Sequence, residues 1–177
     1  MEEKVTDSAR MSLLQKAMML GHCAESRTAV HNSHGHAGKL MAAYFYYIKE
    51  CTKKDFPKLP MLRSFFGKAV EPYGGYIDTK GDVVALNRMV FLGECQCNTT
   101  LNKYNVHQCW VRHDSKLEMC LTDHSHCHID CHDNSSVLIN AVSPNCKCKV
   151  RVYGNSRVTL TGHVECVTIT YTNMQTY

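Results

Sequence analysis

The chain has 177 residues and a formal net charge of +4, from 20 Lys and Arg against 16 Asp and Glu. This length suits one domain or two small ones, and the basic residues are scattered, so nucleic-acid binding is not indicated. Residues 1–5 include acidic residues where a secretory signal needs a basic segment, and the apolar stretch 40–48 is far shorter than the roughly 20 residues of a membrane span. We therefore expect a cytoplasmic protein that does not contact membranes.

The N-terminal region, residues 1–71, is predicted to be helical. A first helix covers residues 11–20, with Asp7 and Ser8 as candidate caps and Gly21 as its end. A second, shorter helix is predicted over residues 26–31. The apolar stripe of the first helix is expected to consist of Met11, Leu14 and Met18, with Leu13 beside it.

The strongest helical pattern covers residues 37–53, and Pro57 and Pro60 end it because proline disfavours the helical conformation in the residue before it. A short helix over residues 61–66 follows. The four aromatic residues 44–47 exceed what one helix face needs; they are expected to cover an end of the following β domain, with a partner or a second copy as the alternative. The apolar positions at three-and-four spacing are Leu40, Met41, Tyr44, Tyr47, Ile48 and Cys51.

Residues 72–75 are rich in turn formers and mark the start of a second domain, residues 72–177, in which the apolar period changes to two. Between Asp114 and Tyr171 a polar turn and an alternating strand recur about every ten residues. A unit this short cannot bury its own apolar face, so neighbouring units must stack. Strands are predicted over residues 83–86, 88–92, 94–97, 106–111, 116–121, 126–131, 136–141, 146–152 and 157–161.

The predicted fold class is therefore α+β, with a helical N-terminal cap followed by a C-terminal β-solenoid-like stack of short strands. A solenoid with two or three strands in each turn would pair every strand in parallel with one from the next turn. An antiparallel β-sandwich, in which consecutive strands pair, is the alternative. The equal strand lengths and the regular Ser and Asn turns favour the solenoid.

Several short motifs of the chain are distinctive: residues 55–57, 65–67, 73–78 and 110–113, and the Asn-Ser turns at Asp133 and Gly154. Together they resemble motifs of small uncharacterised proteins of Bacteroidales bacteria and their mobile elements. The resemblance covers the chain from about Lys39 onward and implies the same arrangement of a helical region and a β-stack. It implies no catalytic residue.

Residues 124–132 hold four histidines, two cysteines and an aspartate, which is the composition of a zinc site. On a strand, however, side chains alternate between faces, so Cys127 and Cys131 are predicted to point inward and the histidines outward. The inward cysteines are expected to be in register with apolar residues such as Val137 and to pack as small hydrophobes. The pairs Cys95/Cys97 and Cys146/Cys148 are interpreted in the same way, with a four-thiolate zinc site as the alternative if two pairs stack.

The outward row gives the sharper metal hypothesis. His126 and His128 lie about 6.6–7 Å apart along one strand, from which both imidazoles can reach one zinc ion, and Asp130 or His132 can complete the site. A solvated polar row is the alternative and is favoured. A catalytic cysteine, Cys109, is disfavoured because its sequence context is that of an alternating structural strand.

The function predicted from these patterns is a non-enzymatic binding or assembly module. Its regular surface suits a repetitive or extended partner, which we expect to be a protein or a second copy of the chain. A metal-binding protein using the outward histidines or stacked thiolates is the alternative, and no cofactor other than zinc is expected. One candidate surface is the threonine row formed by Thr159, Thr161, Thr168 and Thr170.

Overall fold

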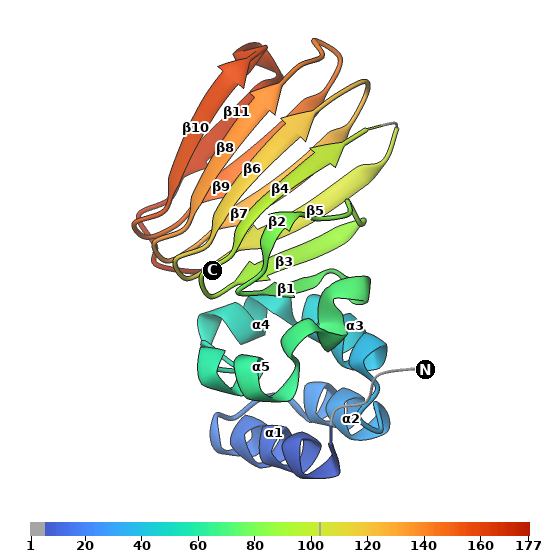
Figure 1. The fold of residues 1–177 in the computed structure, drawn as a ribbon. Coiled ribbons are helices and arrows are strands. Elements are labelled where there is room, and N and C mark those ends of the chain that lie inside the picture. Colours follow the sequence, from blue (N-terminus) through green and yellow to red (C-terminus); the bar gives the residue numbers. More distant parts are fainter. Residues whose placement is uncertain (1–5, 103) are drawn as a thin grey trace. The chain divides into compact units, whose positions relative to one another are not determined.

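The structure is a computed structural model that describes residues 6–102 and 104–177. The first five residues, on which the argument against a secretory signal rests, lie outside this range. The chain divides into two compact units, residues 1–75 together with Tyr177, and residues 76–176 (Figure 1). Within the described residues, no helix has the length and apolar character needed to cross a membrane.

The first unit consists of short helices. The helix predicted over residues 37–53 is divided at Tyr47, whose backbone leaves the helical conformation (φ −101°, ψ 21°). The others lie close to their predicted positions. The helices are α1 (Asp7–Met19), α2 (Ala24–Asn32), α3 (Ala37–Tyr46), α4 (Ile48–Lys53), α5 (Leu59–Phe65) and the 3₁₀ helix η1 (Gly67–Tyr73).

The predicted apolar face of α1 is wrong for Met11 and Met18, while Leu13, expected beside it, is buried. The buried residues of the helix are Ala9, Leu13 and Ala17, whereas Met11 and Met18 are 47% and 60% exposed. Ala9 and Ala17, one helical turn before and after Leu13 on the same face, are small and allow close packing in a helix that contacts α2. The helix is capped by Thr6, whose hydroxyl accepts a hydrogen bond from the Ala9 N–H at 3.3 Å.

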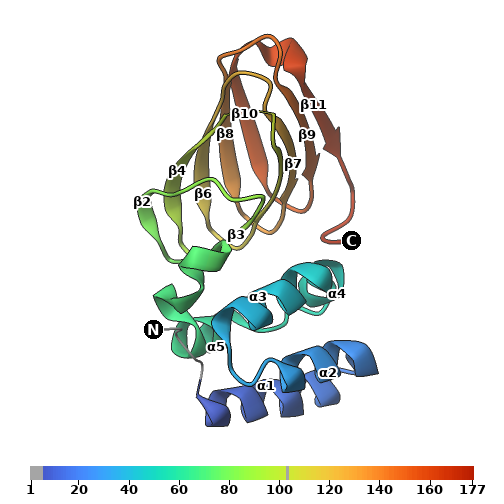
Figure 2. The same ribbon diagram turned by 90° about the vertical axis from the view of Figure 1, so that its right-hand side faces the viewer.

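The second unit is a parallel β-solenoid with two strands in each turn, here called a coil. Figure 2 shows its two sheets facing each other, one in the order β1-β3-β5-β7-β9-β11 and the other β10-β8-β6-β4-β2. The pairing is parallel from β3 to β11 and from β2 to β10, which excludes the antiparallel sandwich. The strands are β1 (Gly75–Ile77), β2 (Lys80–Asp82), β3 (Arg88–Leu92), β4 (Gln96–Leu101), β5 (Val106–Val111), β6 (Lys116–Leu121), β7 (His126–Cys131), β8 (Ser136–Ala141), β9 (Lys147–Val152), β10 (Arg157–Gly162) and β11 (Val167–Tyr171).

The ten-residue repeat is therefore half a coil. Each strand pairs with the strand two units away, so Cys127 lies between His107 and Cys148 rather than beside Val137, which belongs to the opposite sheet. The inward rows of both sheets meet in one continuous core of Leu, Ile, Val, Met and Cys side chains. The predicted alternation is confirmed, while the predicted neighbour of Cys127 is wrong.

Most predicted strands have the observed bounds to within one residue, and the larger differences lie at the ends of the solenoid. The predicted strand over residues 83–86 is an irregular segment, because the strand at this position is β2, immediately before it. The prediction over residues 94–97 marks only the beginning of β4. β11 was predicted only as part of a threonine row.

Polar residues at the turns complete the hydrogen bonding of one solenoid corner. At this corner three serines are buried, and the residue two positions before each has a positive φ, at His113 (59°), Asp133 (63°) and Gly154 (60°); Gly93 (82°) has the same place before Cys95. The serine hydroxyls then donate to main-chain carbonyls of the preceding coil at 3.0–3.1 Å, which explains why serine recurs in the turns. These serines are Ser115, Ser135 and Ser156.

Candidate functional site

The predicted histidine row is divided between the surface and the interior. His126 and His128 are exposed on the outer face of β7, as predicted. Asp130 is on the same face, but its carboxylate accepts two hydrogen bonds from Arg151, from Nε and from Nη2, both at 2.6 Å. This bidentate pair occupies both carboxylate oxygens.

His132 does not lie on the exposed face. It follows the end of β7, is fully buried, and stacks on Tyr153 with ring centroids 4.4 Å apart. Burial, together with the positive charge of Arg112, lowers the pKa of His132 to about 4, so its ring is neutral at neutral pH. The expectation that His132 joins the outward row is wrong because the strand alternation ends at Cys131.

The two exposed histidines have basic neighbours. His126 is paired with Lys147 on β9, and His128 with Lys149. An ammonium group on an adjacent strand repels a divalent cation. Among residues 6–102 and 104–177, no group of three or more His, Cys, Asp and Glu side chains is placed to hold a metal ion. Of the four predicted zinc ligands, only the imidazoles of His126 and His128 remain as candidates.

Cys127 and Cys131, the inward cysteines of β7, pack as thiols, whereas a hydrogen bond with Cys97 lowers the pKa of the buried Cys95 to about 7. The Sγ atoms of Cys109 and Cys127 lie 3.9 Å apart within the core. Hydrogen bonds with Cys109 and Cys148, followed by burial, raise the pKa of Cys127, and burial raises that of Cys131. Since a zinc ligand is a thiolate, these shifts favour packing over ligation. The inward orientation predicted for Cys95, Cys97, Cys146 and Cys148 is confirmed by their burial.

The core also contains Cys109, which the sequence disfavours as a catalytic nucleophile. Cys109 is buried, and its thiol contacts Cys127. His107 Nδ1 lies 3.0 Å from the carbonyl of Leu86. His113 Nδ1 accepts a hydrogen bond from the Gly93 N–H at 3.0 Å, which assigns this ring a structural role in the turn.

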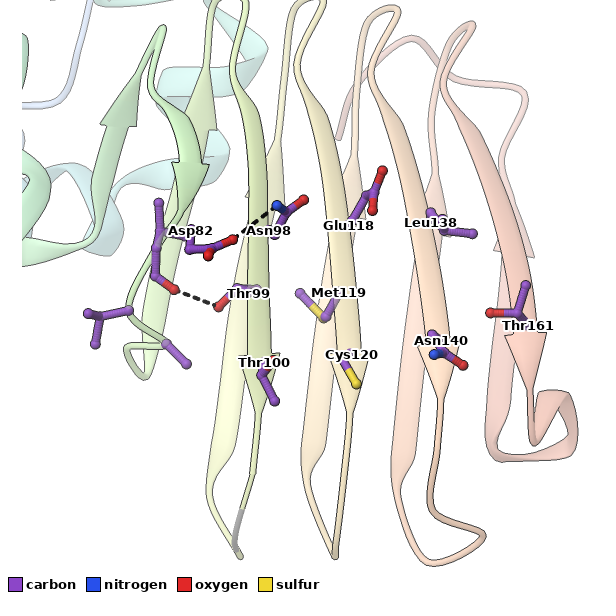
Figure 3. Close-up of a pocket in the computed structure, with 13 residues that line it drawn as sticks. Asp82, Asn98, Thr99, Thr100, Glu118, Met119, Cys120, Leu138, Asn140 and Thr161 are labelled. Carbon is purple, nitrogen blue, oxygen red and sulfur yellow. Dashed lines mark hydrogen bonds between the residues drawn. The ribbon is translucent and has the colours of Figure 1, made fainter.

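The sheet β10-β8-β6-β4-β2 carries a groove of about 610 Å³ on its outer side (Figure 3). Two rows of side chains cross the strands in this groove. In one, which we call the carboxylate row, cross-strand pairing aligns Asp82, Asn98, Glu118 and Leu138. In the other row, it aligns Thr100, Cys120, Asn140 and Thr161.

One wall of the groove is held in place by hydrogen bonds. Val84 exposes 74% of its surface, while its carbonyl accepts a hydrogen bond from the Tyr76 hydroxyl at 2.9 Å. The Thr99 hydroxyl donates to the carbonyl of Val83 at 3.2 Å. Asn98 Nδ2 donates to Asp82 Oδ1 at 3.0 Å, an interaction drawn in Figure 3. The irregular segment 83–86 is thus fixed against the sheet, and the groove is preformed.

Comparison of the chain with protein-family models, with curated proteins and with solved structures found no match. The resemblance to Bacteroidales proteins stays a prediction. The groove is therefore interpreted from its own chemistry.

Sequence reasoning missed the groove because its rows depend on cross-strand pairing. Asn98 and Glu118 become neighbours only with two strands in each coil, and the sequence left open whether a coil has two strands or three. The predicted threonine row is divided for the same reason. Thr159 and Thr161 lie on β10, whereas Thr168 and Thr170 lie on β11 in the other sheet.

Proposed function

We propose that the chain is a protein-binding module that holds an extended segment of a partner protein in the groove of the β10-β8-β6-β4-β2 sheet. The observation that carries this proposal is the preformed groove with its carboxylate row. The role is binding rather than catalysis: Cys120 is the only thiol on the described part of the groove lining, and no histidine lies beside it there to act as a base.

The charges of the groove favour a basic segment. Asp82 and Glu118 are the two ionisable carboxylates of the carboxylate row, and neither Lys nor Arg is among the described residues that line the groove. A Lys or Arg side chain of a partner would gain charge-assisted hydrogen bonds to these carboxylates. Leu138, which is half-buried at the end of this row, offers an apolar contact beside them.

The spacing of the carboxylates favours a particular peptide conformation. Asp82 and Glu118 lie on strands separated by β4, and therefore about 9.6 Å apart at two strand spacings of about 4.8 Å. In a polyproline II segment, residues i and i+3 point in the same direction and lie about 9.3 Å apart. A basic segment in this conformation, with Lys or Arg at i and i+3, matches the row.

The experiment uses fluorescent proline-rich peptides and measures binding by anisotropy. The test peptide carries two lysines three residues apart; matched peptides carry the lysines adjacent, or two glutamates at the original spacing. We expect the first peptide to bind best, and Glu118→Gln to weaken its binding about fivefold, the value of an exposed ion pair near 1 kcal/mol.

The control is Glu25→Gln, which removes an exposed carboxylate on α2 outside the groove lining and should leave binding unchanged. Equal binding of all three peptides, or no effect of Glu118→Gln, would contradict the proposal.

A further inference from the structure

The last coil of the solenoid, formed by β10 and β11, has an open interior. Its inward apolar side chains are only partly buried, whereas Ile139 and Val150 in the coil before it are fully buried. Side chains that continue the core are therefore left uncovered by the described residues. The inward residues of the last coil are Val158, Leu160, Val167 and Ile169.

The same coil presents two backbone edges. β10 and β11 are last in their sheets, and among the described strands their neighbours are β8 and β9. These edges are six and five residues long, whereas β1 and β2 at the opposite end have three residues each. Neither long edge contains proline or an inward charge, the features that commonly protect an edge strand from pairing.

The same end of a second copy has the geometry to pair with it. A twofold axis perpendicular to both the solenoid axis and the strands reverses the strand direction, so each edge strand would pair antiparallel with itself. With Thr159 opposite Thr159 of the second copy, Val158 lies beside Leu160 of the second copy on the inner face. On β11, Ile169 lies opposite Ile169 of the second copy. The inward-facing apolar side chains of both sheets then continue from one copy into the other.

The charges at the two ends of β10 support this arrangement. Arg157 begins β10 and is exposed. Glu165 lies in the exposed 3₁₀ turn η2 (Val164–Cys166) beyond the other end of the strand, where its Oε1 lies 3.0 Å from His163 Nδ1 and its side chain is 66% exposed. Antiparallel pairing brings Arg157 of each copy next to the turn that holds Glu165 of the other, which gives two complementary charge pairs.

We propose that this open coil is a homodimer interface, in which β10 and β11 each pair antiparallel with the same strand of a second copy and Arg157 of one copy pairs with Glu165 of the other. A six-residue strand is about 20 Å long and the sheets lie about 10 Å apart, so each copy would bury about 400 Å² including side chains. Both copies together would bury about 800 Å², well below the roughly 1,600 Å² of a standard interface, which corresponds to a weak, transient dimer.

The first test is sedimentation equilibrium of the full chain with reduced thiols, from about 1 to about 500 μM, which brackets such an affinity. Arg157→Glu and Glu165→Arg should each weaken the dimer about fivefold or more, and the double variant should recover wild-type affinity. The matched control is Lys116→Glu, because Lys116 belongs to the same outward row as Arg157, two strands away, and should not change dimerisation. A strict monomer over this range would overturn the proposal, as would a dimer that neither reversal weakens.

A second test locates the twofold axis. Thr159→Cys would bring two Cβ atoms to about 4.5–5.5 Å across the dimer, close to disulfide distance. We expect oxidised glutathione to convert this variant to a covalent dimer, above the background of the wild-type thiols. Thr100→Cys, at an exposed threonine on β4, is the control. Equal cross-linking of the two variants would overturn the assigned interface.

Discussion

The rings of His132 and Tyr153 stack at an interplanar angle of 12° on successive coils, and together with Arg112 they form one interior column. The three residues follow directly after β7, β9 and β5 at the same corner of the solenoid. Arg112 reaches Asp133, with Nε 3.5 Å from Oδ2. A histidine enclosed between a cation and an aromatic ring is stable only when it is neutral.

This column predicts a pH dependence of stability. The pKa of His132 is about 4 in the folded chain and near 6.5 when unfolded, so between these values the unfolded state binds more protons. The stability contributed by the neutral ring is present above pH 6.5 and is lost as the pH falls towards 4, by up to about 3 kcal/mol. Urea unfolding from pH 7.5 to 4 measures this loss.

The control variants separate His132 from the other histidines. His132→Phe retains the stacking on Tyr153 and should reduce the slope of the pH profile between 6.5 and 4, leaving the contribution of His22, whose pKa is also lowered by burial. His128→Gln removes an exposed histidine and should leave the profile unchanged. A steep profile in His132→Phe would show that another group is responsible.

The Asp130–Arg151 pair predicts an asymmetric mutational response. The Asp130 side chain is 6% exposed and that of Arg151 is 47% exposed. Arg151→Leu leaves a buried carboxylate without its cation and should cost about 2 kcal/mol, whereas Asp130→Asn leaves a half-exposed guanidinium and should cost less. The double variant should be more stable than Arg151→Leu alone. A double-mutant cycle by urea unfolding checks this, and purely additive losses would contradict it.

The cysteine-lined core predicts that polarity matters more than size at Cys127. Cys127→Ser places a hydroxyl among buried thiols and should cost about 1–3 kcal/mol, more than Cys127→Ala. Cys23→Ser, at an exposed helix N-cap, should cause no loss. If Cys127→Ser equals wild type in thermal unfolding while Cys127→Ala is weaker, then hydrogen bonding rather than hydrophobic packing governs this site.

The lysines beside His126 and His128 predict weak zinc binding. We expect protein purified without added metal to contain no stoichiometric zinc, because two imidazoles next to two ammonium groups make a poor site. Elemental analysis and titration calorimetry with zinc chloride measure this. Stoichiometric zinc that is lost in the His126→Gln/His128→Gln double variant would restore the metal hypothesis.

The alternation of side chains made most of the β unit predictable. A period of two assigned Cys127 to the core and His126 to the surface, because it depends only on backbone geometry. Cross-strand neighbours such as Lys147 were not predictable, since they depend on the number of strands in a coil. Predicting the groove also requires the number of strands in a coil. The predicted buried face of α1 was wrong for another reason. Ala9 and Ala17 are buried because they are small, and a hydrophobicity pattern does not take side-chain size into account.

The final prediction concerns Gly162, where β10 meets the turn of the last coil. Its φ is +74°, and a Cβ there would lie 2.3 Å from the carbonyl oxygen of Ala141. Because that atom belongs to the backbone of the preceding coil, Gly162→Ala must displace one coil from the other, and we expect a loss of about 2 kcal/mol or more. Gly154→Asn is the control: its φ of +60° matches that of Asp133 one coil earlier, and its nearest contact is the flexible end of Gln175. Thermal unfolding should show a clear loss for Gly162→Ala and little change for Gly154→Asn. Equal stability of both variants would mean that the last coil moves freely, and would remove the rigid edge on which the dimer depends.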